Sequence, residues 1–261
     1  MILCSFLNNK ILITGSDGFI SKRLKSYLIN KSYDVISTSR VKGDRFYFDL
    51  KNELNTEYTI PHFDILIHLS YLREYSLKEE KKHNINGAKN IFSLAKKYNA
   101  KIIYISSQNA NPNSYSNYGK IKYAIEKIAS QFNSVIIRPG LIYDKNSNAG
   151  IFGNIDKLIK KMPFIIVPSG LNKKLNLCNI ESFNETINDI LINTIHHSKI
   201  DLYERENYNL FDLVKHIAKI NNKKIKILLL NYKIILFLLI FLEFFNIELT
   251  FKSDSLKSLI K

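Results

Sequence analysis

The stretch from Ile11 to Ser21, ILITGSDGFIS, decides the fold, because an apolar strand there runs into a glycine turn that opens a helix. Gly15 and Gly18 stand where the strand gives way to the helix. Glycine suits such a turn because a Cβ would obstruct the approach of a pyrophosphate, which the free N–H groups and positive dipole end of the helix attract. Ser21 occupies the position where a dinucleotide-binding turn usually has a third glycine, so this stretch alone is weak evidence for such a site.

Apolar strands and amphipathic helices alternate through the first half of the chain. Strands that alternate with helices indicate a parallel sheet with right-handed crossovers, so we expect an α/β protein with a doubly wound parallel sheet. We expect helices at 22–30, 84–98 and 118–132, and strands at 10–14, 33–39, 45–50, 63–70, 100–107 and 134–140.

The alternation weakens beyond residue 150. The expected elements there are a short extended run framed by Pro163, Pro168 and Gly170, a helix at 179–195, a short strand that leads into a helix at 208–222, and an apolar helix at 225–245. We therefore expect a dinucleotide-binding domain at residues 1–150. Residues 151–261 are expected to form a smaller, mostly α region, with the chain crossing back to the first domain.

The apolar segment at 225–245 is too interrupted to be expected to span a membrane. Its longest unbroken apolar run, 234–242, is about half of the roughly 20 residues that a membrane-spanning helix needs. Lys226, Lys233 and Glu243 interrupt the rest. A buried or interfacial helix is the expectation, and peripheral contact with a membrane stays open as a second reading.

The composition is that of a folded protein, and the positive net charge makes an anionic partner one of the possibilities to consider. The chain has 261 residues, 46% of them hydrophobic, and a net charge of +15. Because the lysines are scattered rather than gathered in a block, we expect most of them to be solvated, and we expect no nucleic-acid partner. The two cysteines form no metal or redox spacing and the six histidines form no metal spacing, so we expect a cytoplasmic protein without a metal.

Tyr118 and Lys122 form a pair that is able to do acid–base chemistry. The two residues are four apart in YGKIK, so they share one face of the expected helix. A nearby ammonium favours the phenolate and lowers the pKa of a tyrosine, which then exchanges a proton more readily near neutral pH. An ordinary exposed Tyr/Lys pair is the alternative, because the chain has 15 tyrosines.

Ser106 and Ser107 end the expected strand at 100–107. Ligands of open α/β sheets bind beyond the carboxyl ends of the strands, so a hydroxyl there is placed to hydrogen-bond a reacting oxygen. Taken alone, two serines at the end of a strand are usually part of a turn.

The order of these features resembles the short-chain dehydrogenase/reductase superfamily. In detail the chain is similar to its extended NAD-dependent epimerase/dehydratase family, whose members have a Rossmann-type sheet and act on nucleotide sugars. The stretches that carry the resemblance are TGSDGFIS (14–21), DILIHLS (64–70), NINGAKNIFSLAKK (84–97), YGKIKYAIEK (118–127) and IIRPGLIY (136–143).

The resemblance implies roles for individual residues. Tyr118 would be the proton donor and acceptor, Lys122 its partner and a ribose ligand, and Ser107 would hold the substrate oxygen. The residues that the resemblance places along the cofactor, together with Tyr118 and Lys122, are Gly15, Gly18, Phe19, Ile20, Asp49, Leu50, Leu69, Ser70 and Asn84.

Three departures from the family pattern refine the expected chemistry. Ser21 in place of glycine predicts weaker cofactor binding. The expected strand at 33–39 ends without an acidic ribose ligand and is followed by Arg40, which suits a 2′-phosphate, so NADP(H) is favoured over NAD(H). Gln108 and Asn109 stand where the family's dehydratases have an acidic pair, which argues against a 4,6-dehydratase.

We therefore expect an NAD(P)-dependent oxidoreductase or epimerase that acts on a nucleotide-linked sugar, by keto-sugar reduction or hydroxyl oxidation. The alternative is a non-catalytic nucleotide-binding scaffold with the same fold. Two lysines, Lys173 and Lys174, lie where family members contact a nucleotide diphosphate, although solvated lysines are the favoured reading. The helices at 84–98 and 118–132 are the pair through which family members dimerise, so the resemblance also implies a homodimer.

Overall fold

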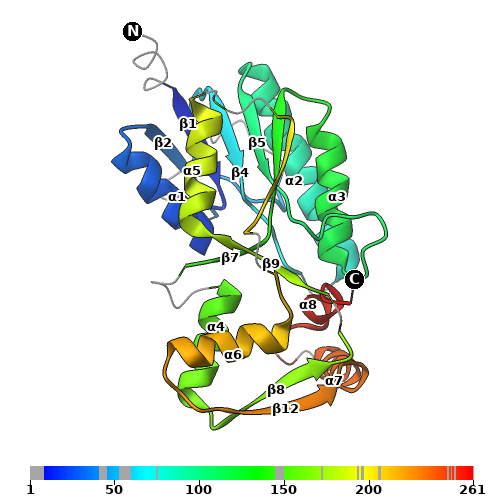
Figure 1. Cartoon of the computed structure of the whole chain (residues 1–261). Coiled ribbons are helices and arrows are strands. Elements are labelled where there is room, and N and C mark those ends of the chain that lie inside the picture. Colours follow the sequence, from blue (N-terminus) through cyan, green and yellow to red (C-terminus); the bar gives the residue numbers. More distant parts are fainter. Residues whose placement is uncertain are drawn as a thin grey trace.

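A seven-stranded parallel sheet forms the main layer of the molecule (Figure 1). The structure is a computed structural model that describes residues 9–40, 46–52, 60–74, 76–144, 150–171, 173–192, 194, 197–204, 207–245, 247, 249 and 251–260. The strand order is β3-β2-β1-β4-β5-β6-β10. The strands are β1 (Lys10–Thr14), β2 (Asp34–Ser39), β3 (Phe46–Tyr47), β4 (Ile65–His68), β5 (Lys101–Ile105), β6 (Ser134–Pro139) and β10 (Lys199–Leu202).

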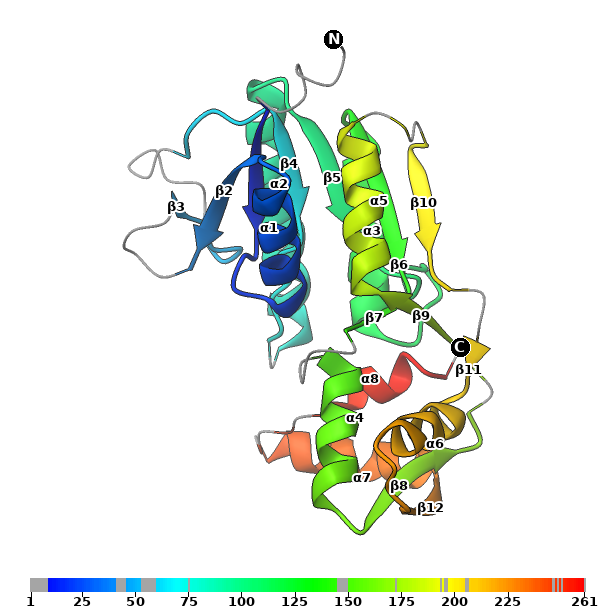
Figure 2. The same cartoon turned by 60° about the vertical axis from the view of Figure 1, so that its left-hand side comes forward.

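Helices cover both faces of this sheet, as the doubly wound prediction requires. Helices α1 (Phe19–Asn30) and α5 (Ile180–Leu191) cover one face, where Leu24, Leu28 and Phe183 pack against apolar side chains of the strands. Figure 2 shows α1 and α5 in front of the sheet, and helices α2 (Leu77–Lys97) and α3 (Asn117–Ala129) lie side by side on the other face (Figure 1). The central strands are buried on both faces, which explains their unbroken apolar sequences.

The strand order reverses between β1 and β4, and this is where ligands of such sheets bind. The last residues of these two strands, Thr14 and His68, lie opposite each other, with Thr14 Oγ1 2.8 Å from His68 Nδ1. Burial lowers the pKa of His68 to about 3, so the imidazole is neutral at physiological pH. This contact holds the two strand ends together at the switch point.

A smaller region, with its own apolar core, lies beyond the carboxyl edge of the main sheet. It contains two small sheets, β11-β9-β7 and β12-β8, and Val167, Leu213 and Ile217 are among its buried core residues. The elements are β7 (Leu141–Tyr143), α4 (Gly150–Lys161), β8 (Phe164–Ser169), β9 (Leu175–Asn179), β11 (Asn207–Tyr208), α6 (Leu210–Ile220), β12 (Lys226–Asn231), α7 (Tyr232–Phe244) and α8 (Ser253–Lys257). Between β9 and β11 the chain returns to the main layer, where it forms α5 and β10.

The segment at 225–245 differs from its predicted form. Its first part is the strand β12, which pairs in parallel with β8, and the helix begins only at Tyr232. No residue of α7, all of which the structure describes, is buried, so of the two expected forms, a buried or an interfacial helix, the buried one is wrong. Within the described residues, no helix is long and apolar enough to cross a membrane.

Candidate active site

The glycine turn between β1 and α1 leaves room for a ligand close to the backbone. Gly15 has a φ of +71°, which favours glycine, and a Cβ there would lie 3.0 Å from the backbone of Ser70 at the end of the neighbouring strand. A Cβ on Gly18 would lie 3.2 Å from the carbonyl oxygen of Gly15. Among the described side chains none caps the start of α1, so the N–H groups of Phe19 and Ile20 face the turn as donors for an anion. The turn therefore fits a pyrophosphate.

Two side chains of the turn fasten it to the end of β2. The hydroxyl of Ser16 donates a hydrogen bond to the carbonyl oxygen of Thr38, and the hydroxyl of Ser39 lies 3.5 Å from Asp17 Oδ2. Arg40 follows directly and is exposed. The turn and the cation that was predicted to select the cofactor are thus neighbours at the same edge of the sheet.

Ser107, Tyr118 and Lys122 meet at the carboxyl end of β5. The Ser107 hydroxyl lies near enough to Tyr118 to lower the pKa of its phenol, and the ammonium of Lys122 lies 5.8 Å from the centre of the Tyr118 ring. Burial raises the pKa of Tyr118 and outweighs the lowering by the positive charge of Arg73 and by the Ser107 hydroxyl, so the expected net lowering beside Lys122 is not found. The local βα unit therefore brings together the three residues that the sequence proposed as catalytic.

Lys122 is buried, and its amino group is surrounded by aromatic rings. Its Nζ donates a hydrogen bond of 2.8 Å to the carbonyl oxygen of Ile105 and lies 5.1 to 5.8 Å from the centres of the Tyr71, Tyr104 and Tyr118 rings. Burial lowers the pKa of Lys122 to about 7. The lysine is therefore poised between its charged and neutral forms near neutral pH.

Helix α3, which carries Tyr118, is anchored by Glu126 in its last turns. Both carboxylate oxygens of Glu126 accept hydrogen bonds from Arg138 on β6, at 2.7 and 2.6 Å. Glu126 also accepts hydrogen bonds from the Ser106 hydroxyl and the Lys199 ammonium. One carboxylate thus joins α3 to β5, β6 and β10, which fixes where the helix presents Tyr118.

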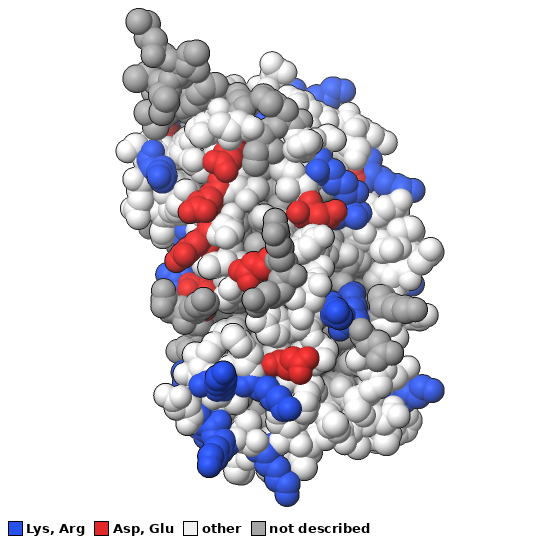
Figure 3. Space-filling model, in the orientation of Figure 1, with Lys and Arg blue, Asp and Glu red and all other residues white. Residues whose placement is uncertain are grey.

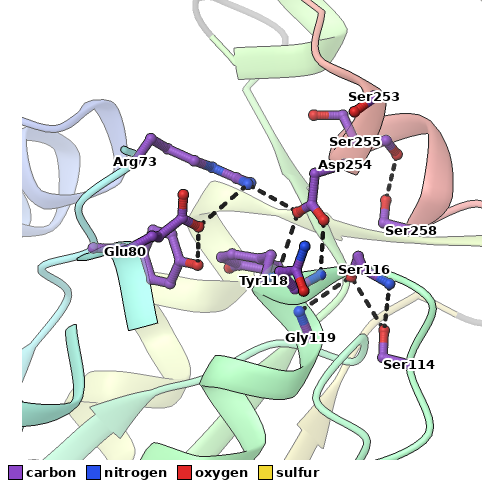
Figure 4. A network of polar contacts seen from close by, with 12 residues as sticks. Arg73, Glu80, Ser114, Ser116, Tyr118, Gly119, Ser253, Asp254, Ser255 and Ser258 are labelled. Carbon is purple, nitrogen blue, oxygen red and sulfur yellow. Dashed lines mark hydrogen bonds and ion pairs between the residues drawn. The ribbon is translucent and has the colours of Figure 1, made fainter. Parts of the chain in front are cut away.

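The carboxylate of Asp254, from helix α8 near the end of the chain, caps the start of helix α3 (Figure 4). Asp254 Oδ1 accepts a hydrogen bond of 2.7 Å from the N–H of Asn117, and its Oδ2 lies 3.3 Å from the N–H of Tyr118. Ser116 Oγ accepts from the N–H of Gly119 at 3.1 Å. Asp254 therefore supplies the negative charge that the start of α3 lacks in its own first turn.

Asp254 also positions Arg73 over the Tyr118 ring. Arg73 Nη1 lies 3.1 Å from Asp254 Oδ2, and the guanidinium carbon lies 4.9 Å from the ring centre of Tyr118 (Figure 4). Tyr71 packs edge-on against Tyr118, with ring centres 4.8 Å apart, and donates a hydrogen bond to Glu80. The sequence reasoning did not find Arg73, Tyr71 or Asp254, because no local spacing links them to Tyr118.

Three other predicted cofactor residues, Asn84, Leu50 and Asp49, differ in their burial and in their hydrogen bonds. Asn84 uses both its amide groups on the chain, since Oδ1 accepts from the N–H of Leu72 and Nδ2 donates to the carbonyl oxygens of Leu72 and Glu80. Leu50 is buried against Gly87 of α2. Asn84 thus shapes the segment that follows β4, which carries Leu69 and Ser70. Asp49 is half-buried, and its Oδ1 accepts a hydrogen bond from the N–H of Lys51.

Gln108 and Asn109 tie the segment after β5 to the smaller region. Gln108 Oε1 accepts a hydrogen bond from Asn176, and Asn109 Oδ1 accepts one of 2.6 Å from Lys173 Nζ. Lys173 also donates to the carbonyl oxygen of Ser258, so the expectation of a solvated side chain is wrong for Lys173, whereas Lys174 is exposed. Lys173 further lines a pocket of about 170 Å³ between β8, β9 and α6.

The fold and this site define a dinucleotide-binding protein of the Rossmann type. The model of the NAD dependent epimerase/dehydratase family matches residues 11–162, which is more than half of the chain. The protein therefore belongs to that family, as its motifs predicted.

Solved structures share the fold over most of the chain, although their sequences are distant. A dTDP-4-dehydrorhamnose reductase from Bacillus anthracis, in complex with NADP, has a TM-score of 0.73 at 19% identity and covers 87% of this chain and 86% of its own. A UDP-glucose 4-epimerase from Thermotoga maritima, with UDP-glucose, has a TM-score of 0.72 at 15% identity and covers 85% of each chain. A comparison with curated proteins finds no match.

Proposed function

We propose that this protein is an NAD(P)-dependent oxidoreductase or epimerase that acts on a nucleotide-linked sugar, with keto-sugar reduction or hydroxyl oxidation as the favoured reaction. The observation that carries the proposal is the meeting of Ser107, Tyr118 and Lys122 at the sheet edge that also holds the glycine turn. A bound nicotinamide would supply or accept the hydride at the sugar carbon. The residues of this chain would transfer the proton to or from the sugar oxygen.

In the direction of reduction, Tyr118 gives its phenolic proton to the sugar oxygen as the carbonyl becomes a hydroxyl. Ser107 holds that oxygen with its hydroxyl, and the positive charges of Lys122 and Arg73 stabilise the phenolate that remains. In the direction of oxidation, the phenolate takes the proton back from the hydroxyl. Epimerisation through a transient ketone uses the same two proton steps in succession.

The surroundings of Ser107 support hydride chemistry without loss of water. Neither Gln108 nor Asn109 exchanges a proton at neutral pH, and both are engaged by residues of the smaller region. NADP(H) is the favoured cofactor because exposed Arg40 follows β2, where it would meet a 2′-phosphate. The pocket beside Lys173 is a candidate for the nucleotide part of the substrate.

The test is a screen of keto- and hydroxy-nucleotide sugars with NADPH, NADH and their oxidised forms, followed at the nicotinamide absorbance. Turnover of at least one sugar is expected. Purified Tyr118→Phe protein should keep cofactor binding and lose roughly 10²- to 10⁴-fold in turnover. Full activity in that variant would refute the role of Tyr118.

A non-catalytic scaffold of the same fold is the second candidate, and Ser21 in the glycine turn is the feature that favours it. Titration with NADPH and NADH, followed by nicotinamide fluorescence, separates the two proposals. Binding of either cofactor without turnover of any sugar, or binding of neither, would favour the scaffold.

A further inference from the structure

Helix α7 presents an apolar stripe to solvent. Six apolar side chains of this stripe are about half exposed or more, with Phe237 at 69% and Phe244 at 80%. Their spacing of three and four residues places them on adjoining faces of the helix. The stripe consists of Ile234, Phe237, Leu238, Phe241, Phe244 and Phe245, the last of which follows the helix. Such an exposed apolar surface normally lies in a protein core, against a partner or in lipid, whereas no other part of the described structure covers this stripe.

The stripe is ordered by contacts among its own aromatic rings. Phe241 stacks on Phe237 with ring centres 6.5 Å apart, and its ring centre lies 5.0 Å from that of Phe245. Phe244 and Phe245 lie edge-on at 5.4 Å. The neighbouring sheet adds Ile166 of β8 and Leu228 of β12, which lie opposite each other in register and are exposed at 51% and 39%.

Positive charge accompanies this apolar surface. Residues 210–260 contain eight lysines and four acidic residues. Of the two charged residues in α7, Glu243 is directed toward α8, where both its oxygens accept hydrogen bonds from Ser253, whereas Lys233 is exposed. On the face drawn in Figure 3, most of the charged side chains in the part of the molecule below the main sheet are Lys or Arg. The surface thus combines exposed aromatic rings with lysines.

We propose that α7 binds the surface of a lipid bilayer that contains anionic lipids, with its axis in the plane of the interface. The apolar stripe enters the boundary between headgroups and acyl chains, and the lysines that precede and follow it in the chain, such as Lys226, Lys233 and Lys257, face the anionic headgroups. At 13 residues, α7 is too short to cross the bilayer, which fits attachment to one leaflet. A second copy of the chain is less favoured because the same positive charge would face itself across a symmetric interface.

Flotation of the full-length protein with vesicles tests this proposal. The vesicles contain phosphatidylcholine alone or with about 30% phosphatidylglycerol. The test variant is Phe237→Glu/Phe241→Glu. The matched control is Ile29→Glu/Leu77→Glu, which makes the same change at two exposed apolar residues of α1 and α2, 49% and 54% exposed. Circular dichroism checks that both variants fold like the wild type.

We expect the wild type and the control to float with the anionic vesicles, and the α7 variant to float at least about 10-fold less. Added salt should reduce the flotation of the wild type. The proposal is overturned if the wild type stays at the bottom of the gradient, floats equally with neutral vesicles, or loses flotation in the control as well. A dimer in light scattering that only the α7 variant breaks, without flotation of the wild type, would assign the stripe to self-association instead.

Discussion

Lys122 is a buried ammonium whose carbonyl partner and surrounding rings only partly replace the water it has lost. Burial lowers its pKa from 10.5 to about 7 in the folded protein. Below pH 7 the lysine is charged in both states, so the full cost of burying the charge opposes folding. As the pH rises from 7 towards 10.5, the folded protein loses this proton while the unfolded chain keeps it, and stability rises.

We therefore expect the free energy of unfolding to rise more steeply from pH 7 to pH 9.5 in the wild type than in Lys122→Met. Each unit by which the pKa is lowered corresponds to about 1.4 kcal/mol. Urea denaturation at several pH values measures this difference. Parallel pH profiles for the two proteins would contradict the lowered pKa. The comparison stops at pH 9.5 because tyrosines of the unfolded chain ionise above it.

Arg40 offers a direct test of cofactor choice. In Arg40→Ala the affinity for NADPH should fall about tenfold or more, because a charged hydrogen bond to a 2′-phosphate is lost, while the affinity for NADH should stay the same. Fluorescence titration with both cofactors measures the two dissociation constants, and NADH serves as the internal control. An equal loss for both would show that Arg40 acts on the fold of the turn and not on the phosphate.

The meeting of Ser107, Tyr118 and Lys122, the proposed catalytic residues, could be predicted from the sequence because they lie within one strand-to-helix unit, where local spacing fixes their geometry. Arg73 and Asp254 could not be found in this way. Asp254 is separated from Asn117 by 137 positions, and the packing of α8 on the start of α3 brings the two together. Residues that meet through such long-range packing leave no periodic signal in the sequence.

At the scale of elements, α8 caps the start of α3, the helix that carries Tyr118. In Asp254→Ala the N–H groups of Asn117 and Tyr118 lose their acceptor and Arg73 loses its partner. We expect a loss of about 1 to 2 kcal/mol in the free energy of unfolding. We also expect a lower turnover number, because Arg73 would no longer be held over the Tyr118 ring.

Urea denaturation and steady-state kinetics measure the two effects of Asp254→Ala. Asp212→Ala is the control, since Asp212 is an exposed residue in the first turn of α6 and lies on the smaller region. A loss of stability with unchanged turnover would show that Asp254 holds α8 in place without positioning the site.

Element boundaries were predicted well where the chain repeats strand and helix, and less well elsewhere. The buried strands β4 and β5 lie within their expected ranges because their apolar runs are bounded by polar turns. The helix expected at 84–98 begins already at Leu77, where Ser76 accepts a hydrogen bond from the N–H of Glu79. The apolar run of β12 has no helical or alternating period, so pairing with β8 decides its structure.

At the scale of the whole molecule, two regions that differ in burial meet at the candidate active site. The strands of the main sheet are buried on both faces, whereas α7 has no buried residue along its described length. Local opening is easiest where few apolar contacts are buried. We therefore expect amide hydrogens of α7 to exchange with solvent faster than those of β4 and β5.

Anionic vesicles should slow this exchange in α7, because the bilayer would then cover its apolar stripe. Glu243 connects α7 to Ser253 at the start of α8, and Asp254 connects α8 to the first turn of α3, so we expect the protection to extend to these two helix starts. Helix α1 makes none of these contacts in the described structure and should exchange at an unchanged rate. Hydrogen exchange followed by mass spectrometry measures all of these segments in one experiment. Protection of α7 alone would show that the bilayer contact is independent of the site, and equal protection of α1 would show a general effect of the vesicles.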